Sequence, residues 1–243
     1  MRSAGTFLAF AALLVLAASP AVAQEMSISL GGEGQSLSLR SVQLLLLITV
    51  LSIVPGLAVM VTCFPFIVTV LSILRQALGL QQAPPNMLII SLALFLTWFV
   101  MDPVFNEAWV KGIEPMTNGT LDVGPGLQAA IAPFRAFMAL RVDVETLQTL
   151  QDLRATTPVT PGDAPLSLLV PSFLLSEIQR AFEIGFMIFL PFLIIDLVVA
   201  AILMSMGMMM VPPAVVSLPF KLIFFVVADG WALISGALVR SYF

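Results

Sequence analysis

The sequence predicts an all-α, membrane-associated protein in which two long, kinked apolar helical hairpins flank a polar, mostly helical middle region. Three observations predict this class. Of the 243 residues, 60% are hydrophobic and only 10% are charged, whereas about 25% of an ordinary soluble domain is charged. Fifteen of the 24 charged residues lie between Asp102 and Glu183, so a polar region separates two apolar blocks. Prolines and glycines interrupt both blocks, which favours breaks and turns within them.

Composition also excludes several classes of function. The net charge of -4 offers no broad basic face, so nucleic acid is not an expected partner. The chain has no His, which removes the commonest general base and the usual zinc ligand, and we expect no metal and no cofactor. Its one cysteine, Cys63, lies in an apolar run and is predicted to be a small buried hydrophobe.

Residues 1–23 have the layout of a cleaved signal peptide. Arg2 precedes an apolar stretch from Phe7 to Ala18, and Ala21-Val22-Ala23 form a small-residue cleavage site. The apolar stretch is too short to span a membrane comfortably, although a retained N-terminal anchor is the alternative. Residues 24–40 are then expected to be an extracytoplasmic N-terminal segment.

The first apolar hairpin is predicted over residues 41–101. No charged residue lies between Arg40 and Arg75, nor between Arg75 and Asp102. A helix over the first of these intervals would be about 51 Å long, against an apolar bilayer core of about 30 Å. Breaks are therefore expected at Pro55-Gly56 and at Pro65.

Residues 102–170 are predicted to be a polar extracytoplasmic region with short amphipathic helices. Asp143 is a candidate N-cap for the second of them, and Asn118-Gly119 and Pro158 to Pro165 are expected to be turns or loops. The apolar positions recur at helical spacing in two runs: Leu127, Ile131, Phe134 and Met138, then Leu147, Leu150 and Leu153.

The second apolar hairpin is predicted over residues 171–243. Its first helix is expected to begin at Pro171, to kink at Pro191 and to end at Gly207. Its second apolar segment follows Pro212-Pro213 and runs from Ala214 to about Val239.

The distribution of basic residues conflicts with four independent membrane crossings. With the N-terminus outside, Arg75 alone would lie inside, while Lys111, Arg135, Arg141 and Arg154 would lie outside. Cytoplasmic loops normally carry the excess of Lys and Arg, although long regions are translocated largely irrespective of charge. The conflict favours apolar segments that are buried mainly against protein in a larger assembly.

Six charged residues in the second block form a predicted network for packing and assembly. A carboxylate at the bilayer centre costs about 2.5 to 3.5 kcal/mol, so such groups usually find partners. Lys221 can pair with Asp196 or Asp229, in the same subunit or the next. The alternative is a proton or ion relay through Asp196 and Lys221. The +3 spacing also lets two acids flank one arginine on a helical stripe: Glu177, Arg180 and Glu183.

Five of the 13 methionines fall in the loop over residues 204–210. Gly207 and Pro212-Pro213 end helices, so Met208 to Met210 should lie at a hairpin turn. Methionine is flexible and can fill changing shapes, and a ring of such side chains would form an apolar constriction that sheds water when closed. Binding of a soft metal and plain apolar filling are the alternatives; a ring further requires several copies of the chain.

Two stretches of the chain carry motifs of a known family. The first, Thr62 to Thr97, contains VLSILRQALG at Val70 to Gly79 and Pro84-Pro85-Asn86. The second, Ser172 to Trp231, contains Leu175-Ser176-Glu177, Pro191 to Asp196, Met204 to Met210 with Pro212-Pro213, Ser217 to Lys221 and Asp229-Gly230-Trp231. With these motifs the chain resembles the FliP family of flagellar type III export-apparatus proteins. It departs from that family at Pro65-Phe66, where a basic residue is common.

This resemblance implies a non-enzymatic core subunit of the flagellar export gate, in a multi-subunit helical ring at the base of the flagellum. Several FliP copies, typically five, would join FliQ and FliR, with FlhB, FlhA and the assembly helper FliO as further partners and unfolded flagellar polypeptides as the substrate. The implied location is the bacterial inner membrane, in the flagellar basal body, with much of the mass on the extracytoplasmic side. The gasket of the gate would be formed by a set of methionines: Met206, Met208, Met209 and Met210.

Two other functions compete with this one. The equivalent subunit of a virulence injectisome shares both stretches, although its family usually lacks a signal peptide. An ion channel or transporter would use Asp196 and Lys221. An intramembrane enzyme has little support, because the sequence has neither a His-Glu-x-x-His nor a Gly-x-Ser-x-Gly motif.

Overall fold

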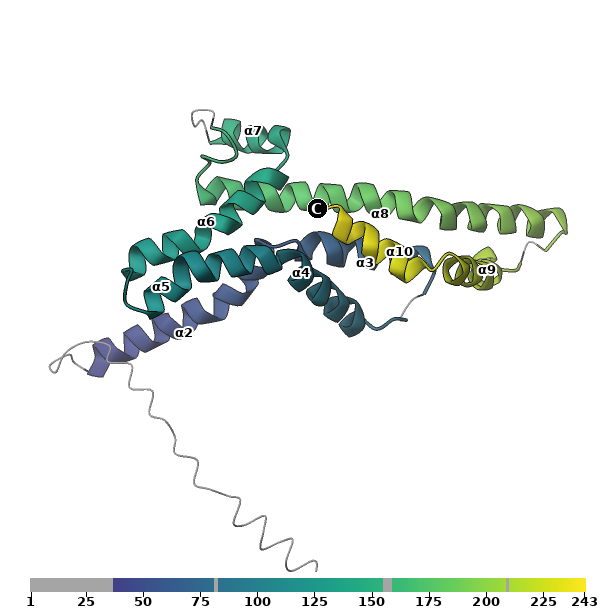
Figure 1. The fold of residues 1–243 in the computed structure, drawn as a ribbon. Coiled ribbons are helices and arrows are strands. Elements are labelled where there is room, and N and C mark those ends of the chain that lie inside the picture. Colours follow the sequence, from purple (N-terminus) through teal and green to yellow (C-terminus); the bar gives the residue numbers. More distant parts are fainter. Residues whose placement is uncertain (1–36, 81–82, 155–158, 209) are drawn as a thin grey trace, which may run out of the picture. The chain divides into compact units, whose positions relative to one another are not determined.

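The computed structural model describes residues 37–80, 83–154, 159–208 and 210–243, and the regular elements among them are all helices (Figure 1). The predicted all-α class is therefore confirmed. Contacts divide the chain into a unit that ends at Leu51 and one that begins at Ser52, and every helix from Phe64 onward belongs to the second unit. The predicted signal peptide, residues 1–23, lies outside the described residues, as does most of the segment 24–40.

Helix α2 (Leu37–Met60) is strongly apolar and carries no charged residue after Arg40. The break predicted at Pro55-Gly56 is wrong, because α2 continues through both residues; an interior proline removes one backbone hydrogen bond and need not end an apolar helix. The chain breaks instead at residues 61–63. There the Thr62 hydroxyl donates to the Val59 carbonyl at 2.7 Å and accepts from the Phe64 amide at 3.3 Å.

Helix α3 (Phe64–Ala77) lies at the centre of the largest hydrophobic core. Pro65 lies in its first turn, where a missing N–H costs no helical bond. The helix packs against α4 (Asn86–Ala108) and α8 (Leu166–Ser205). A Cβ atom on Gly185 of α8 would lie 2.4 Å from Ile73 Cδ1, so a larger residue there would force the Ile73 side chain to shift. The fully buried side chains of α3 share one side of the helix: Phe66, Ile67, Val70, Leu71, Leu74 and Ala77.

The middle region is mostly helical, although two positions of the predicted apolar stripes, Leu127 and Leu153, are exposed. Helix α4 passes into a π-helical turn, η1 (Trp109–Ile113), and then into the short α5 (Glu114–Thr117). Gly119, with φ +69°, ends this run in the predicted turn. Helix α6 (Val123–Arg141) then packs back onto η1 and α4, and α7 (Val144–Leu153) packs on the first part of α8.

Helix α8 extends over 40 residues without interruption, from Leu166 to Ser205 (Figure 1). It begins before Pro171, where a start was predicted, and it continues through Pro191. The following apolar segment, predicted as one piece, is two helices: α9 (Pro213–Val227) and α10 (Gly230–Arg240) are bent by 62° relative to each other. Asp229 causes this break, because it adopts the left-handed conformation with φ 49°.

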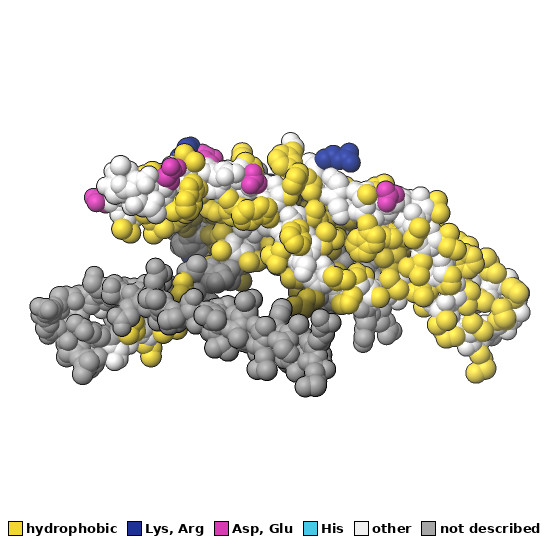
Figure 2. Space-filling view, turned by 60° about the horizontal axis from the view of Figure 1, so that its bottom comes forward, with side chains coloured by type: hydrophobic (Ala, Val, Ile, Leu, Met, Phe, Trp, Pro, Cys, Tyr) yellow, Lys and Arg dark blue, Asp and Glu magenta, His cyan; other side chains and the backbone are white. Residues whose placement is uncertain are grey.

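Three of the described helices are long and apolar enough to cross a membrane, and the bent α9–α10 pair would be a fourth. Helix α8 has 40 residues, which makes it about 60 Å long, twice the thickness of a bilayer core. Lipid alone therefore cannot cover it from end to end. Figure 2 shows hydrophobic side chains gathered toward the end where α8 and α9 meet.

Candidate functional site

The methionine-rich turn joins α8 to α9 and has a defined backbone geometry. Gly207 adopts φ +75° and donates its N–H to the Met204 carbonyl at 3.1 Å, and the Met208 N–H donates to the Leu203 carbonyl at 3.0 Å. This pair of bonds is the Schellman motif that ends helices. Pro212 and Pro213 then start α9. The predicted helix end at Gly207 is confirmed.

Most of the methionines in this turn project into solvent. Met210 is 97% exposed, whereas Met208 is 39% exposed. Met206 and Met208 line one side of an apolar groove of about 520 Å³ between α8 and α9, with Val216 and Phe220 on the other side. Met209 lies outside the described residues. An apolar cluster so exposed is unusual for a soluble surface.

An ion pair fastens the hairpin that carries this turn. Lys221 of α9 donates to Asp196 Oδ2 of α8 at 2.6 Å and to the Ala77 carbonyl at the end of α3 at 3.1 Å. The Ser217 hydroxyl donates to Asp196 Oδ1 at 2.5 Å. Of the two partners considered for Lys221, the structure shows Asp196. Lys221 therefore joins three helices at a buried position, where the carbonyl end of α3 also favours a positive charge.

A second polar cluster surrounds Glu177, which is completely buried in α8. Its Oε1 accepts from Arg141 Nε of α6 and from Arg180 Nη1, each at 3.1 Å. The Tyr242 hydroxyl, near the C-terminus, donates to Oε2. Arg141 also lies 4.1 Å over the Tyr242 ring and donates to the Ser241 carbonyl at 2.9 Å. This arrangement satisfies a buried carboxylate from three directions and connects the end of the chain to the first third of α8.

Two residues assigned to the buried network lie outside it. Glu183 is exposed and accepts from Gln179 at 3.1 Å. Arg180 turns toward Glu177 instead, so the predicted stripe of two acids about one arginine is wrong. Asp229 is exposed at the break between α9 and α10 and has no ion pair among the described residues, because Lys221 is held by Asp196.

Most residues of these clusters lie within the part of the chain that matches a known family, and Ser241 and Tyr242 follow it. The profile of the FliP family matches residues 47–238, which is most of the chain and includes the methionine-rich turn, the Lys221 pair and Glu177. The chain belongs to the FliP family.

Relatives from several bacteria carry the name of this family. The chain is 48% identical over 236 residues to a "Flagellar biosynthetic protein FliP" of Caulobacter vibrioides, covering 97% of this chain and 88% of the relative. It is 45% identical over 203 residues to that of Bacillus subtilis, covering 83% and 92%. It is 40% identical over 245 residues to that of Aquifex aeolicus, covering the whole of both chains.

Three polar residues of the Lys221 and Glu177 clusters were not predicted from the sequence. Arg141 and Tyr242 lie far from Glu177 along the chain. Ser217 is uncharged, so a search for pairs of charged residues does not find it. Helical spacing detects partners on one helix only, so it found Arg180 and could not find the others. Among the described residues, no group of three or more His, Cys, Asp or Glu side chains could hold a metal ion.

Proposed function

We propose that this FliP-family chain is a core subunit of the flagellar type III protein export gate, needed for flagellum assembly. Several copies surround a channel for unfolded flagellar polypeptides, and the methionine-rich turn seals it. The observation that carries the proposal is the exposed methionine cluster on a fixed turn at the end of a hairpin. The chain acts without catalysis, in the bacterial inner membrane at the flagellar basal body.

The geometry of the turn supports a seal. The Schellman bonds at Gly207 and Met208 fix the backbone, whereas the methionine side chains keep their flexibility. A turn whose first residues are fixed and whose apolar side chains are flexible can exclude water when closed and still yield to a passing polypeptide. Met210, at 97% exposed in the single chain, is available to contact the same turn of neighbouring copies.

The exposed apolar surface supports assembly with other chains. Side chains along the distal part of α8 and along α9 are exposed although they are strongly apolar, and α8 exceeds one bilayer thickness. Neighbouring copies of this chain, together with FliQ and FliR, would cover that surface. FlhB, FlhA and FliO complete the set of proposed partners, and the equivalent subunit of an injectisome remains the alternative assignment.

The full set of bonds around Lys221 and Asp196 favours a structural role over an ion relay. A relay group must gain and lose a proton, but Lys221 is held by both Asp196 and the Ala77 carbonyl. A double variant, Asp196→Asn with Lys221→Met, distinguishes the structural role from the ion relay. Retained secretion would exclude obligatory proton transfer at this pair.

The seal is tested by replacing Met208, Met209 and Met210 together with alanine in cells that secrete flagellar subunits. The complex should still assemble, and the membrane should leak small ions during secretion, measured as a fall in membrane potential. Met87→Ala is the matched control, because Met87 is 79% exposed at the start of α4, outside the turn. An unchanged ion conductance in the triple variant would contradict the proposed gasket.

A further inference from the structure

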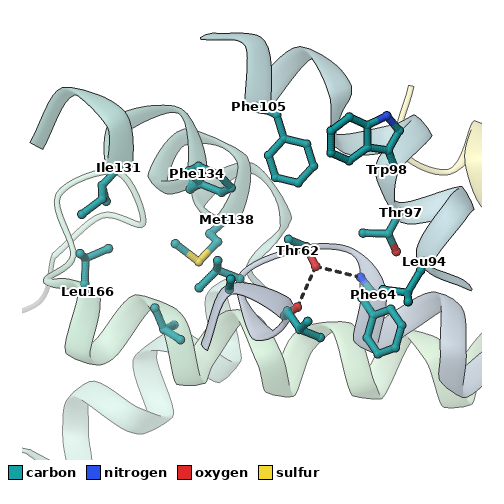
Figure 3. Close-up of a pocket in the computed structure, with 14 residues that line it drawn as sticks. Thr62, Phe64, Leu94, Thr97, Trp98, Phe105, Ile131, Phe134, Met138 and Leu166 are labelled. Atoms are coloured by element: carbon teal, nitrogen blue, oxygen red, sulfur yellow. Dashed lines mark hydrogen bonds between the residues drawn. The ribbon is translucent and has the colours of Figure 1, made fainter. Parts of the chain in front are cut away.

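A second apolar cavity, of about 470 Å³, lies between the end of α2, α4, α6 and the start of α8 (Figure 3). Its lining is hydrophobic except for Thr62 and Thr97. The Thr62 hydroxyl already donates to the Val59 carbonyl, and the Thr97 hydroxyl oxygen is shielded from solvent. The walls therefore present apolar surface, in a volume typical of sites for small organic molecules.

Aromatic rings gather at one end of this cavity. The ring centroids of Trp98 and Phe105 are 5.3 Å apart, and those of Phe105 and Phe134 are 5.8 Å apart. Figure 3 shows Trp98 and Phe105 at this end and Ile131 and Leu166 at the opposite end. The faces of such rings carry negative electrostatic potential and attract organic cations.

A carboxylate that does not itself line the cavity, Asp102, lies near two of these rings, Trp98 and Phe105, on α4. Asp102 follows Trp98 by four residues and precedes Phe105 by three, which places it one helical turn from each ring. It is exposed, it accepts from the Asn106 amide at 3.1 Å, and it makes no ion pair within the described part of the chain. Arg135, beside Phe134 on α6, donates instead to the Gly162 carbonyl at 3.4 Å.

We propose that this cavity is a binding site for small lipophilic organic cations. The apolar body of the ligand fills the cavity, and its positive charge lies over the aromatic rings within the field of Asp102. Charge complementarity selects this class among apolar occupants. A neutral acyl chain would use the walls alone, and a lipophilic anion would be repelled by the carboxylate and by the ring faces. The site is independent of the methionine-rich turn and of the proposed gate.

The proposal is tested with tetraphenylphosphonium and tetraphenylborate, which have nearly the same size and opposite charge. Binding to the full chain in lipid nanodiscs is measured by flow dialysis, and the binding to empty nanodiscs is subtracted. Tetraphenylphosphonium should bind saturably at one site per chain, and tetraphenylborate should show no saturable component. Ile131→Trp, which fills the cavity, should abolish saturable binding, and Val170→Phe serves the same purpose from α8.

Two acidic residues on α4 provide the matched comparison. Asp102→Asn should weaken binding of the cation about fivefold, as expected for loss of one partly screened charge interaction. Glu107→Gln removes an equal charge from the opposite side of the same helix and should leave the affinity unchanged, while Asp102→Glu should retain it. Equal effects of Asp102→Asn and Glu107→Gln, equal binding of both ions, or no saturable binding would each overturn the proposal.

Discussion

Tyr242 donates its hydroxyl to Glu177, a completely buried carboxylate 65 residues earlier in the chain. Burial, followed by the neighbouring negative charge of Glu177, raises the pKa of Tyr242 well above its ordinary value, so the phenol remains a donor. The Tyr242 ring also stacks on Phe137 and meets Phe66 edge to face. The last residues of the chain thus lock α10 to α3, α6 and α8.

The first prediction concerns this lock. Glu177→Gln should lower the free energy of unfolding by about 3 to 5 kcal/mol, because it leaves the partly buried Arg141 and Arg180 charges without their carboxylate. Tyr242→Phe should cost about 1.5 to 3 kcal/mol, the contribution of a hydrogen bond to a charged group. Thermal unfolding in detergent measures both. Glu183→Gln, on the exposed side of α8, is the control, and a loss equal to that of Glu177→Gln would rule out this account.

The second prediction is non-additivity at the Lys221 pair. Lys221→Met alone leaves Asp196 with the Ser217 hydroxyl as its remaining partner, and Asp196→Asn alone leaves a lysine that is 6% exposed without a counter-ion. Each should cost about 3 to 5 kcal/mol, whereas the double variant should recover much of the loss. Unfolding of the four proteins in one double-mutant cycle gives the coupling energy. Additive losses would mean that the two side chains do not stabilise each other.

The sequence predicted the helical class and the methionine-rich turn because both depend on local chemistry. Apolar runs, the Gly207 helix end and the Asp143 cap each require only a few neighbouring residues. The break at Pro55-Gly56 and the helix start at Pro171 were placed wrongly, because the effect of a proline on a helix depends on what replaces the lost backbone bond. The Glu177 cluster depends on contacts between distant segments, and no periodicity in one chain reveals that Arg141 and Tyr242 meet.

A third prediction compares two glycines near the π-helical turn. A Cβ atom on Gly112 would lie 2.4 Å from the Ala130 backbone nitrogen, whereas one on Gly124 would meet nothing within 4 Å. Gly112→Ala should therefore separate η1 from α6 and cost about 1 to 3 kcal/mol. Gly124→Ala, in the first turn of α6, should stabilise the protein by about 0.4 to 1 kcal/mol. Thermal unfolding measures the change in the free energy of unfolding for both variants. A change of the same sign in the two would contradict the packing described between η1 and α6.

The fourth prediction uses Cys63 as a reporter of folding. Its side chain is fully buried between α2 and α3, and burial raises the pKa of the thiol to about 12. The thiolate is the reactive form, so maleimide labelling at pH 8 should be very slow in the folded protein and rapid after denaturation. Mass spectrometry of the labelled chain measures the two rates. Rapid labelling of folded protein would show that the break between α2 and α3 opens readily.

The fifth prediction concerns the pH dependence of α7. Asp143 Oδ2 accepts from the Thr146 N–H at 2.8 Å and from its hydroxyl at 2.9 Å. These bonds to the charged form hold the pKa of Asp143 below its ordinary value of 3.8. A lowered pKa means that the cap stabilises the folded state fully above that ordinary value, and that its contribution disappears as the pH falls through the lowered pKa. Amide hydrogen exchange in α7, corrected for intrinsic rates, should therefore accelerate below about pH 4.

Asp143→Ala should lose about 1 kcal/mol of protection at neutral pH. Asp143→Asn, which caps without ionising, should keep that protection at neutral pH and lose its acid dependence. Acid-dependent exchange that persists in the Asn variant would assign the effect to another carboxylate.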